Sequence, residues 1–133
     1  MELHKKSVLF CSSAAENYLI DKMNEIKIFS PATVANVSCG FDVLGFCLDS
    51  VGDDMVIRKI EKKGIFITKI EGFDLPYETE LNVAGVSALA MYNSLDLDFG
   101  FEIEIYKKIK PGSGIGSSAA SAVGSVFGMN ELL

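Results

Sequence analysis

Three glycines within five residues separate a strand pattern from a helix pattern near the end of the chain. They are Gly112, Gly114 and Gly116. Glycines let the backbone turn tightly with its N–H groups facing inward, and the following helix adds the positive end of its dipole. Ser117 and Ser118 place hydroxyl groups at the start of that helix, within reach of a phosphate oxygen or a bound Mg²⁺. The segment therefore predicts a cradle for an anion such as a phosphate group.

The elements on either side of the glycines have the clearest periodicity in the chain. Residues 100–107 alternate between apolar and polar, which places Phe101, Ile103 and Ile105 on one face of a strand. Residues 117–133 have a helical apolar pattern that is still running at the last residue. The expected order is thus strand, glycine loop and helix, which is the context that a phosphate site needs.

Three further strands are expected from runs of β-branched and aromatic residues. They cover residues 26–30, 55–57 and 65–68. A charged turn at 61–64 separates the last two, so we expect those two strands to pair antiparallel. Pro31 lacks a backbone N–H and is expected to end regular pairing of the first strand.

The remaining segments complete an α+β fold class. Apolar residues among small and polar ones at 31–50 predict a loop that lies against the core. Apolar spacings of three and four predict a helix over 80–95, with Thr79 as its N-cap. Gly124 and Gly128 are expected to let the last helix pack closely. We therefore expect a mostly antiparallel sheet with helices packed on it.

Composition excludes several classes of protein. The 133 residues are 49% hydrophobic and 23% charged, which is too apolar for a disordered tail. Apolar runs fall far short of the roughly 20 residues that span a bilayer. A net charge of −6 makes a nucleic-acid backbone an unfavourable partner, because phosphate binding needs a concentrated cationic face. We expect neither a membrane nor a nucleic acid as partner.

The cysteines and the start of the chain bear on location and boundaries. Cys11, Cys39 and Cys47 are odd in number and lack CxxC spacing, which predicts neither a disulfide framework nor a zinc site and favours the cytoplasm. Met23 stands directly before the first strand pattern, so translation could begin there. We treat residues 1–22 as a doubtful N-terminal extension and residues 23–133 as the domain.

The glycine loop is compatible with more than one function. A Walker A loop requires a Lys after the glycines, and its absence here excludes a P-loop ATPase. Gly114, Gly116 and Ala119 fit the loose form of a dinucleotide-binding fingerprint, although the strands before the loop look antiparallel. A glycine-serine turn that only caps a tightly packed helix needs no ligand. Both of these alternatives stay open.

Two motifs together resemble one family. Residues 110–120, Lys-Pro-Gly-Ser-Gly-Ile-Gly-Ser-Ser-Ala-Ala, resemble the ATP-binding motif of the GHMP kinases, with Ile115 where Leu is usual. Residues 30–45 resemble the N-terminal motif of the homoserine kinases within that superfamily, and residues 82–85 fit the same family. The resemblance covers about residues 26–133. It implies the ribosomal protein S5 domain 2-like fold of the GHMP kinase N-terminal domain, incomplete at the C-terminus.

The resemblance also implies a reaction and a set of site residues. Homoserine kinases transfer the γ-phosphoryl group of ATP, with Mg²⁺, to the side-chain hydroxyl of L-homoserine in threonine biosynthesis. By position, Asp42 matches the residue for the substrate ammonium and Asn36 the residue for its hydroxyl. Ser118 matches a Mg²⁺ contact. The implied ATP-binding residues are Asn82, Pro111, Gly112, Ser113, Gly114, Ile115, Gly116, Ser117, Ser118, Ala119 and Ala120.

Simpler roles exist for three of these residues, and other parts of the family's site have no counterpart here. Asn36 and Asp42 are also typical of turns, and Asn82 is typical of a helix cap. The family's Mg²⁺-binding Glu, the Arg residues for the substrate carboxylate and a C-terminal Gly-rich motif would lie beyond Leu133. We therefore assign no catalytic residue and expect the 133-residue chain alone to be inactive. Other alcohol acceptors, and a homodimer of the full-length protein, stay open.

Overall fold

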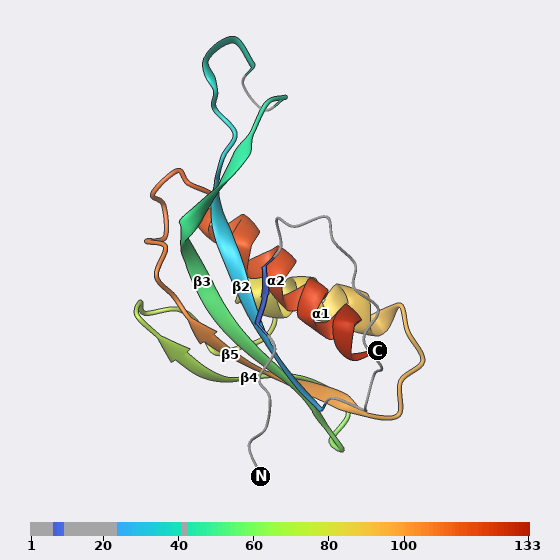
Figure 1. Ribbon diagram of the computed structural model, residues 1–133. Helices are drawn as coiled ribbons and strands as arrows, with labels where there is room; N and C mark the ends of the chain where they lie inside the picture. The colour runs from blue at the N-terminus through green and yellow to red at the C-terminus, as the bar shows by residue number, and fades with distance from the viewer. Residues whose placement is uncertain (1–6, 10–23, 41–42) are drawn as a thin grey trace.

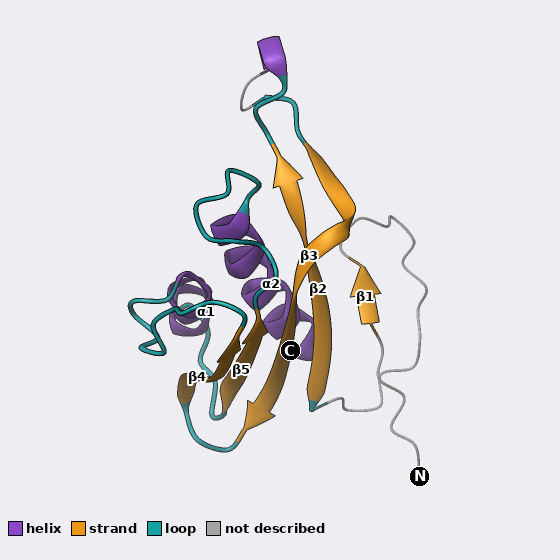
Figure 2. Ribbon diagram, turned by 90° about the vertical axis from the view of Figure 1, so that its left-hand side faces the viewer, coloured by secondary structure: helices purple, strands orange, loops and turns teal. Residues whose placement is uncertain are grey.

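The computed structural model describes residues 7–9, 24–40 and 43–133. A mixed sheet forms one layer, and two helices form a second layer on one of its faces (Figures 1 and 2). The elements are β1 (Ser7–Leu9), β2 (Glu25–Val34), η1 (Ser38–Gly40), β3 (Phe46–Ile60), β4 (Gly64–Glu71), α1 (Val83–Asn93), β5 (Gly100–Tyr106) and α2 (Ser117–Leu132). The α+β class is as expected. Within the described part of the chain, no helix is long and apolar enough to cross a membrane.

The strand order of the sheet is β1-β2-β3-β5-β4. β3 pairs antiparallel with both β2 and β5, whereas the β4/β5 and β1/β2 pairs are parallel. The expected antiparallel pair between residues 55–57 and 65–68 is therefore wrong, because β5 lies between them: Ile105 pairs with Met55, and Ile103 pairs with Ile67. A period of two predicts which face of a strand is buried, but it does not identify the neighbouring strand.

The core lies between the sheet and the helices. β2 and β5 bury alternate apolar side chains, whereas β3 buries the consecutive residues 55–57. β5 buries the three residues that the alternation predicts: Phe101, Ile103 and Ile105. α2 covers β2 and β3, and it approaches them through glycines. A Cβ on Gly124 would lie 2.2 Å from Ser30 Oγ. The close packing expected for this helix is confirmed.

Residues 31–50 differ from the expected loop against the core. β2 continues through Pro31 to Val34 and pairs with β3, and the two strands project beyond the helices (Figures 1 and 2). The pairing shifts register between Pro31 and Thr33, an irregularity at which a residue without an N–H is tolerated. Apolar side chains near the tip are exposed, with Val43 at 85%. Their hydrophobicity had suggested burial.

The start of α1 also differs from expectation. The helix begins at Val83, and its N-cap is Asn82, whose Oδ1 accepts a hydrogen bond from the N–H of Ala84 at 3.0 Å. Thr79, the expected cap, donates its hydroxyl to the carbonyl of Ile65 at 2.9 Å. The turn before Asn82 keeps Thr79 outside the helix. The boundaries of α2, in contrast, agree with the predicted helix.

The segment before residue 24 is described only in part. β1, at residues 7–9, pairs in parallel with the outer edge of β2, with Ser7 opposite Lys27 and Leu9 opposite Phe29. Residues 1–6 and 10–23 lie outside the described residues, and so does Asp42.

Candidate functional site

The loop between β5 and α2 turns through three left-handed glycines. Gly112, Gly114 and Gly116 have φ angles of 74°, 77° and 73°. L-residues with a side chain avoid this region, so the predicted tight turn depends on glycine. At Gly112 and Gly114 an added Cβ would meet open space, but at Gly116 it would lie 2.2 Å from Thr33 Oγ1. Gly116 is therefore required by its backbone and by its contact with β2.

Hydrogen bonds hold the loop on the end of the sheet. The N–H of Thr33 donates to the carbonyl of Ile115 at 3.0 Å, which ties the loop to β2. The hydroxyl of Ser117 donates to the carbonyl of Ile109 at 3.1 Å and is buried. Ser118, the next residue, is exposed. The two serines therefore differ: the Ser117 hydroxyl closes the loop, whereas Ser118 is exposed.

The start of α2 is built to receive an anion. Its N-cap residue, Gly116, has no side chain that could satisfy the first N–H groups of the helix. These N–H groups and the helix dipole favour negative charge at this end. Ile115 does not face the ligand side of the loop, because it packs on the small cluster of Ala32, Ile109 and Ala120.

A buried ion pair lies beneath the loop. Lys107 and Asp53 are 4% and 0% exposed, and the Lys107 ammonium donates to Asp53 Oδ2. The same ammonium donates to the Ser117 carbonyl and to Ser121 Oγ, both at 2.8 Å. Asp53 Oδ1 accepts the N–H groups of the two residues that follow Lys107, at 2.7 and 2.8 Å. Both charges are thus fully hydrogen-bonded.

The sequence-based prediction missed this pair, although the sequence contains a sign of it. Asp53 is in phase with the buried residues Met55 and Ile57 of β3, and Lys107 is in phase with Ile105 of β5. An acid and a base that continue the buried phase of two strands indicate an ion pair under the helix layer.

A cavity of about 350 Å³ lies beside the loop. Its lining combines the loop with the start of α1: Leu75, Pro76, Leu81, Asn82, Val83, Lys107, Pro111, Gly112, Gly114, Gly116, Ser117, Ser118 and Ser121. The structure therefore brings Asn82 next to the glycine loop. Its amide is engaged, because Oδ1 caps α1 and Nδ2 donates to the carbonyl of Pro76 at 2.8 Å. The helix-cap role that the sequence left open is the one that the structure shows.

Ala119, Ala120 and Asn36 lie away from this cavity. Ala119 and Ala120 line a second hollow of about 560 Å³ at the base of the β2–β3 projection, with Val34 and Phe46. Asn36 is exposed on the connector between β2 and β3, and its carbonyl accepts the N–H of Ser38 at 3.1 Å. The structure does not place Asn36 at the loop cavity.

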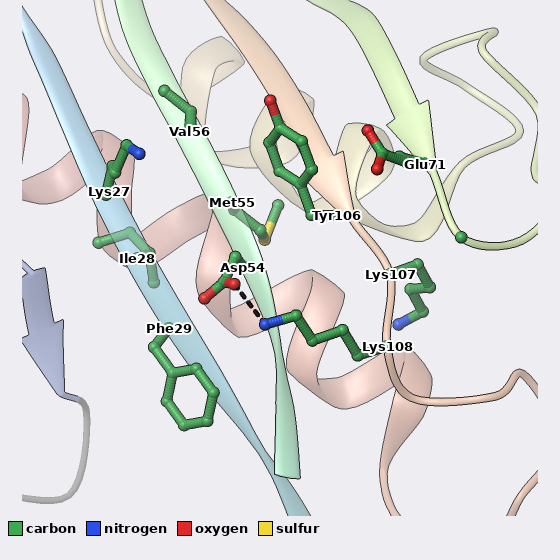
Figure 3. A pocket seen from close by; sticks show the side chains of 11 residues that line it. Lys27, Ile28, Phe29, Asp54, Met55, Val56, Glu71, Tyr106, Lys107 and Lys108 are labelled. Carbon is green, nitrogen blue, oxygen red and sulfur yellow. Dashed lines mark hydrogen bonds and ion pairs between the residues drawn. The ribbon is translucent and has the colours of Figure 1, made fainter. Parts of the chain in front are cut away.

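The face of the sheet opposite the helices has its own hollow, also of about 560 Å³ (Figure 3). Lys27, Asp54, Tyr106 and Lys108 line it, and Lys108 forms an ion pair with Asp54 at 2.7 Å. None of the predicted site residues that the structure describes lies here. We therefore place the candidate site at the smaller cavity beside the glycine loop.

Carboxylates are not grouped at the loop. Across residues 24–40 and 43–133, no cluster of three or more His, Cys, Asp or Glu side chains could hold a metal ion. The exposed hydroxyl of Ser118 is the only oxygen ligand in the loop that the sequence singled out for Mg²⁺. Such an ion would be held largely by phosphate oxygens and water, as Mg²⁺ often is.

Residues 80–133 match the family of GHMP kinases N terminal domain. The chain is 46% identical over 112 residues to a homoserine kinase of Xylella fastidiosa, covering 83% of this chain and 35% of that protein. A homoserine kinase of Methanococcus vannielii is 42% identical over 113 residues, covering 83% of this chain and 37% of that protein. The chain thus spans about a third of the length of these relatives.

Solved structures agree with the sequence matches. The crystal structure of homoserine kinase from Cytophaga hutchinsonii superposes with a TM-score of 0.80 at 48% identity, covering 88% of this chain and 38% of that one. A putative homoserine kinase from Listeria monocytogenes superposes with a TM-score of 0.59 at 28% identity, covering 81% and 36%. By sequence and by fold, the chain is similar to part of homoserine kinases, and residues 80–133 match the GHMP kinases N terminal domain.

Proposed function

We propose that this chain forms the nucleotide-binding part of a kinase that transfers the γ-phosphoryl group of ATP to the side-chain hydroxyl of L-homoserine. The observation that carries the proposal is the loop at 112–118, where three left-handed glycines meet the N-terminus of α2 beside a cavity. The relatives named above, which are homoserine kinases, support the choice of acceptor.

In this proposal the loop binds the phosphates mainly through its backbone. The proposed ATP-binding set is Asn82 together with Pro111, Gly112, Ser113, Gly114, Gly116, Ser117 and Ser118. Ile115, Ala119 and Ala120, which the sequence also suggested, lie away from the cavity and are left out of the proposed set. Ser117 contributes its N–H group, because its hydroxyl is already bonded to Ile109. Ser118 contributes its exposed hydroxyl to Mg²⁺. Apolar residues at the start of α1, such as Leu81 and Val83, suit the adenine side of the cavity.

We assign the acceptor to the β2–β3 connector. The amide of Asn36 would bind the reacting hydroxyl of homoserine, and the carboxylate of Asp42 would bind its ammonium group. Phosphoryl transfer passes through a loose transition state, so positioning and charge neutralisation supply most of the catalysis. Mg²⁺ supplies part of that neutralisation when it is bound. A dedicated base is not required of this chain.

The proposal extends to the whole protein. Residues 23–133 would be the N-terminal, ATP-binding domain of a cytoplasmic enzyme of threonine biosynthesis, for which a homodimer is the assembly to test. Since the chain spans about a third of its relatives, we expect it to bind nucleotide without turning over homoserine.

Calorimetric titration of the 133-residue chain with MgATP, NAD and L-homoserine tests the binding step. We expect saturable MgATP binding, weaker binding in Ser118→Ala, and wild-type affinity in Ser94→Ala, whose exposed hydroxyl donates to the Met91 carbonyl at the C-terminal end of α1. Binding of NAD in preference to MgATP would instead support the dinucleotide alternative. ADP release with homoserine by this chain, abolished by Ser118→Ala, would contradict the expected lack of turnover.

A further inference from the structure

The ion pair between Lys107 and Asp53 joins the two ends of the glycine loop. Lys107 directly follows β5, where the loop segment begins, and its ammonium reaches the first two turns of α2 at Ser117 and Ser121. Asp53, in the middle of β3, holds the ammonium and also fixes the backbone of residues 108 and 109. One carboxylate and one ammonium therefore connect a strand, the start of the loop and the helix that ends it.

This arrangement is specific, because every polar atom of the ion pair has a hydrogen-bond partner. A lysine ammonium has three donors, and Lys107 uses one each on Asp53, Ser117 and Ser121. Among the described residues, no buried side-chain nitrogen or oxygen atom lacks a partner. The geometry leaves little freedom for the loop ends to shift.

Stability alone is a weak reason for such a pair. Burying two charges costs solvation, and replacing a buried pair with apolar residues of similar volume often leaves stability unchanged or raises it. A role in geometry explains the pair better, because it anchors the chain on both sides of the glycine loop, at residues 108 and 109 and at Ser117. The N–H groups that the proposed function assigns to the phosphates lie between these points and on Ser117 itself. Small changes in the separation of these points would turn the N–H groups away from a common centre.

We propose that Asp53 and Lys107 are positioning residues, which hold the two ends of the loop at the separation that makes its N–H groups converge on a phosphate. Lys107 lines the cavity, but its three donors are used on Asp53, Ser117 and Ser121, so neither residue needs to touch the nucleotide for this role. The affinity measurement rests on the proposed nucleotide site. The effect of the ion pair on the loop does not depend on any ligand.

The test uses the 133-residue chain, two variants and one matched control. Lys107→Met removes the ammonium, and Asp53→Asn combined with Lys107→Met also removes the carboxylate charge that would otherwise stay buried and unpaired. Arg58→Met is the control, because it breaks ion pairs with Glu25 and Glu104 on the opposite face of the sheet. Amide hydrogen exchange reports the loop, and calorimetric titration with MgATP reports the site.

We expect both Lys107 variants to exchange faster at residues 108–121 by about tenfold, while β4 and α1 stay protected. MgATP affinity should fall on the order of tenfold at unchanged stoichiometry, the size expected for losing hydrogen bonds to a charged group. Arg58→Met should lower overall stability with no local change at the loop and no change in affinity.

Two results would overturn the proposal. Exchange that is unchanged, or faster across the whole chain, would show that the pair has no local effect on the loop. Wild-type MgATP affinity in the folded fraction of the double variant would show that loop geometry does not depend on the pair. If the wild-type chain bound no MgATP, the proposed function would fail, while the exchange measurement would still decide whether the pair positions the loop.

Discussion

Gly112 and Gly116 have the same left-handed backbone but different surroundings. Their φ angles are 74° and 73°, yet an added Cβ meets open space at the first and Thr33 Oγ1 at the second. The two positions therefore separate the cost of backbone strain from the cost of crowding within one loop.

We predict that Gly112→Ala lowers the free energy of unfolding by about 1–2 kcal/mol, the cost of a left-handed alanine. Gly116→Ala should lower it by a further 1–3 kcal/mol or so, because the methyl group collides with Thr33. Urea unfolding of both variants measures the difference. Equal losses of unfolding free energy at the two positions would show that β2 shifts to make room for the methyl group, so that the contact with Thr33 costs no stability.

Residues of the loop were predictable where their role is local. Three glycines and two serines at fixed spacings indicate a tight turn at a helix start without reference to the rest of the chain. Asp53 and Lys107 were not predicted, because their pairing depends on two strands meeting 54 positions apart in sequence. Asn82 was predicted as a ligand and as a cap, and only the three-dimensional contacts with Pro76 and Ala84 show the second role.

At the scale of elements, α2 and the sheet fit together through glycine. A Cβ on Gly128 would lie 2.2 Å from Ile57 Cδ1 and 3.0 Å from Ile28 Cγ1. This contact lets the helix axis come close to β2 and β3, which it covers. The position of α2, and with it the anion-binding N-terminus, depends on that approach.

We predict that Gly128→Ala destabilises the chain by a net 1–2 kcal/mol or so, although alanine favours the helix by about 1 kcal/mol. Ile57→Val, which removes the Cδ1 carbon, should cost about 0.5–1.5 kcal/mol alone. In the double variant the alanine has room, so the combined loss should be smaller than the sum. If chemical denaturation showed that the two losses of stability add up, the strain in Gly128→Ala would not come from the contact with Ile57.

Periodicity predicted β5 and α2 because each has one buried face that repeats over several residues. It failed for residues 31–50, because the sequence alone does not distinguish an exposed apolar residue such as Val43 from a buried one. It also failed for the pairing of β3 with β4, because strand order is decided by the chain as a whole. Charge and hydropathy patterns are local, whereas neighbours in a sheet are not.

At the scale of the whole molecule, one arginine joins three strands on the open face of the sheet. The Arg58 guanidinium of β3 donates to the carboxylates of Glu25 in β2 and of Glu102 and Glu104 in β5. The hydrogen bond from Arg58 is the main cause that lowers the pKa of Glu104, and a second comes from the Tyr106 hydroxyl. The carboxylates of Glu104 and Glu25 in turn raise the pKa of Arg58.

The lowered pKa of Glu104 predicts acid sensitivity. A carboxyl whose pKa is lower in the folded state adds stability above its unfolded pKa, and this stability is lost as the pH falls through the folded pKa. Glu104→Gln should therefore be less stable than wild type by about 0.5–1 kcal/mol at pH 7, and the gap should narrow as the pH falls through the folded pKa of Glu104.

Urea unfolding from pH 7 to pH 3 measures this gap. Glu61→Gln, in the exposed turn after β3, is the control and should change stability at pH 7 by less than about 0.5 kcal/mol. A gap that is as large at pH 3 as at pH 7 would show that Glu104 stabilises the sheet by packing and not by its charge.

The place of β5 in the sheet has a consequence for how the protein is made. β5 is the last strand along the chain, yet it pairs on both sides, with β3 and with β4. In the sheet, β5 lies between β3 and β4, and β5 is the one described strand that pairs with β4. Before the ribosome has made residues 100–106, β4 therefore has no described strand to pair with. Long-range pairing of this kind slows folding, since the ends of a long segment must first meet. The sheet can therefore close only after translation has passed Tyr106, and until then the nascent chain exposes the apolar face on which the helices will pack.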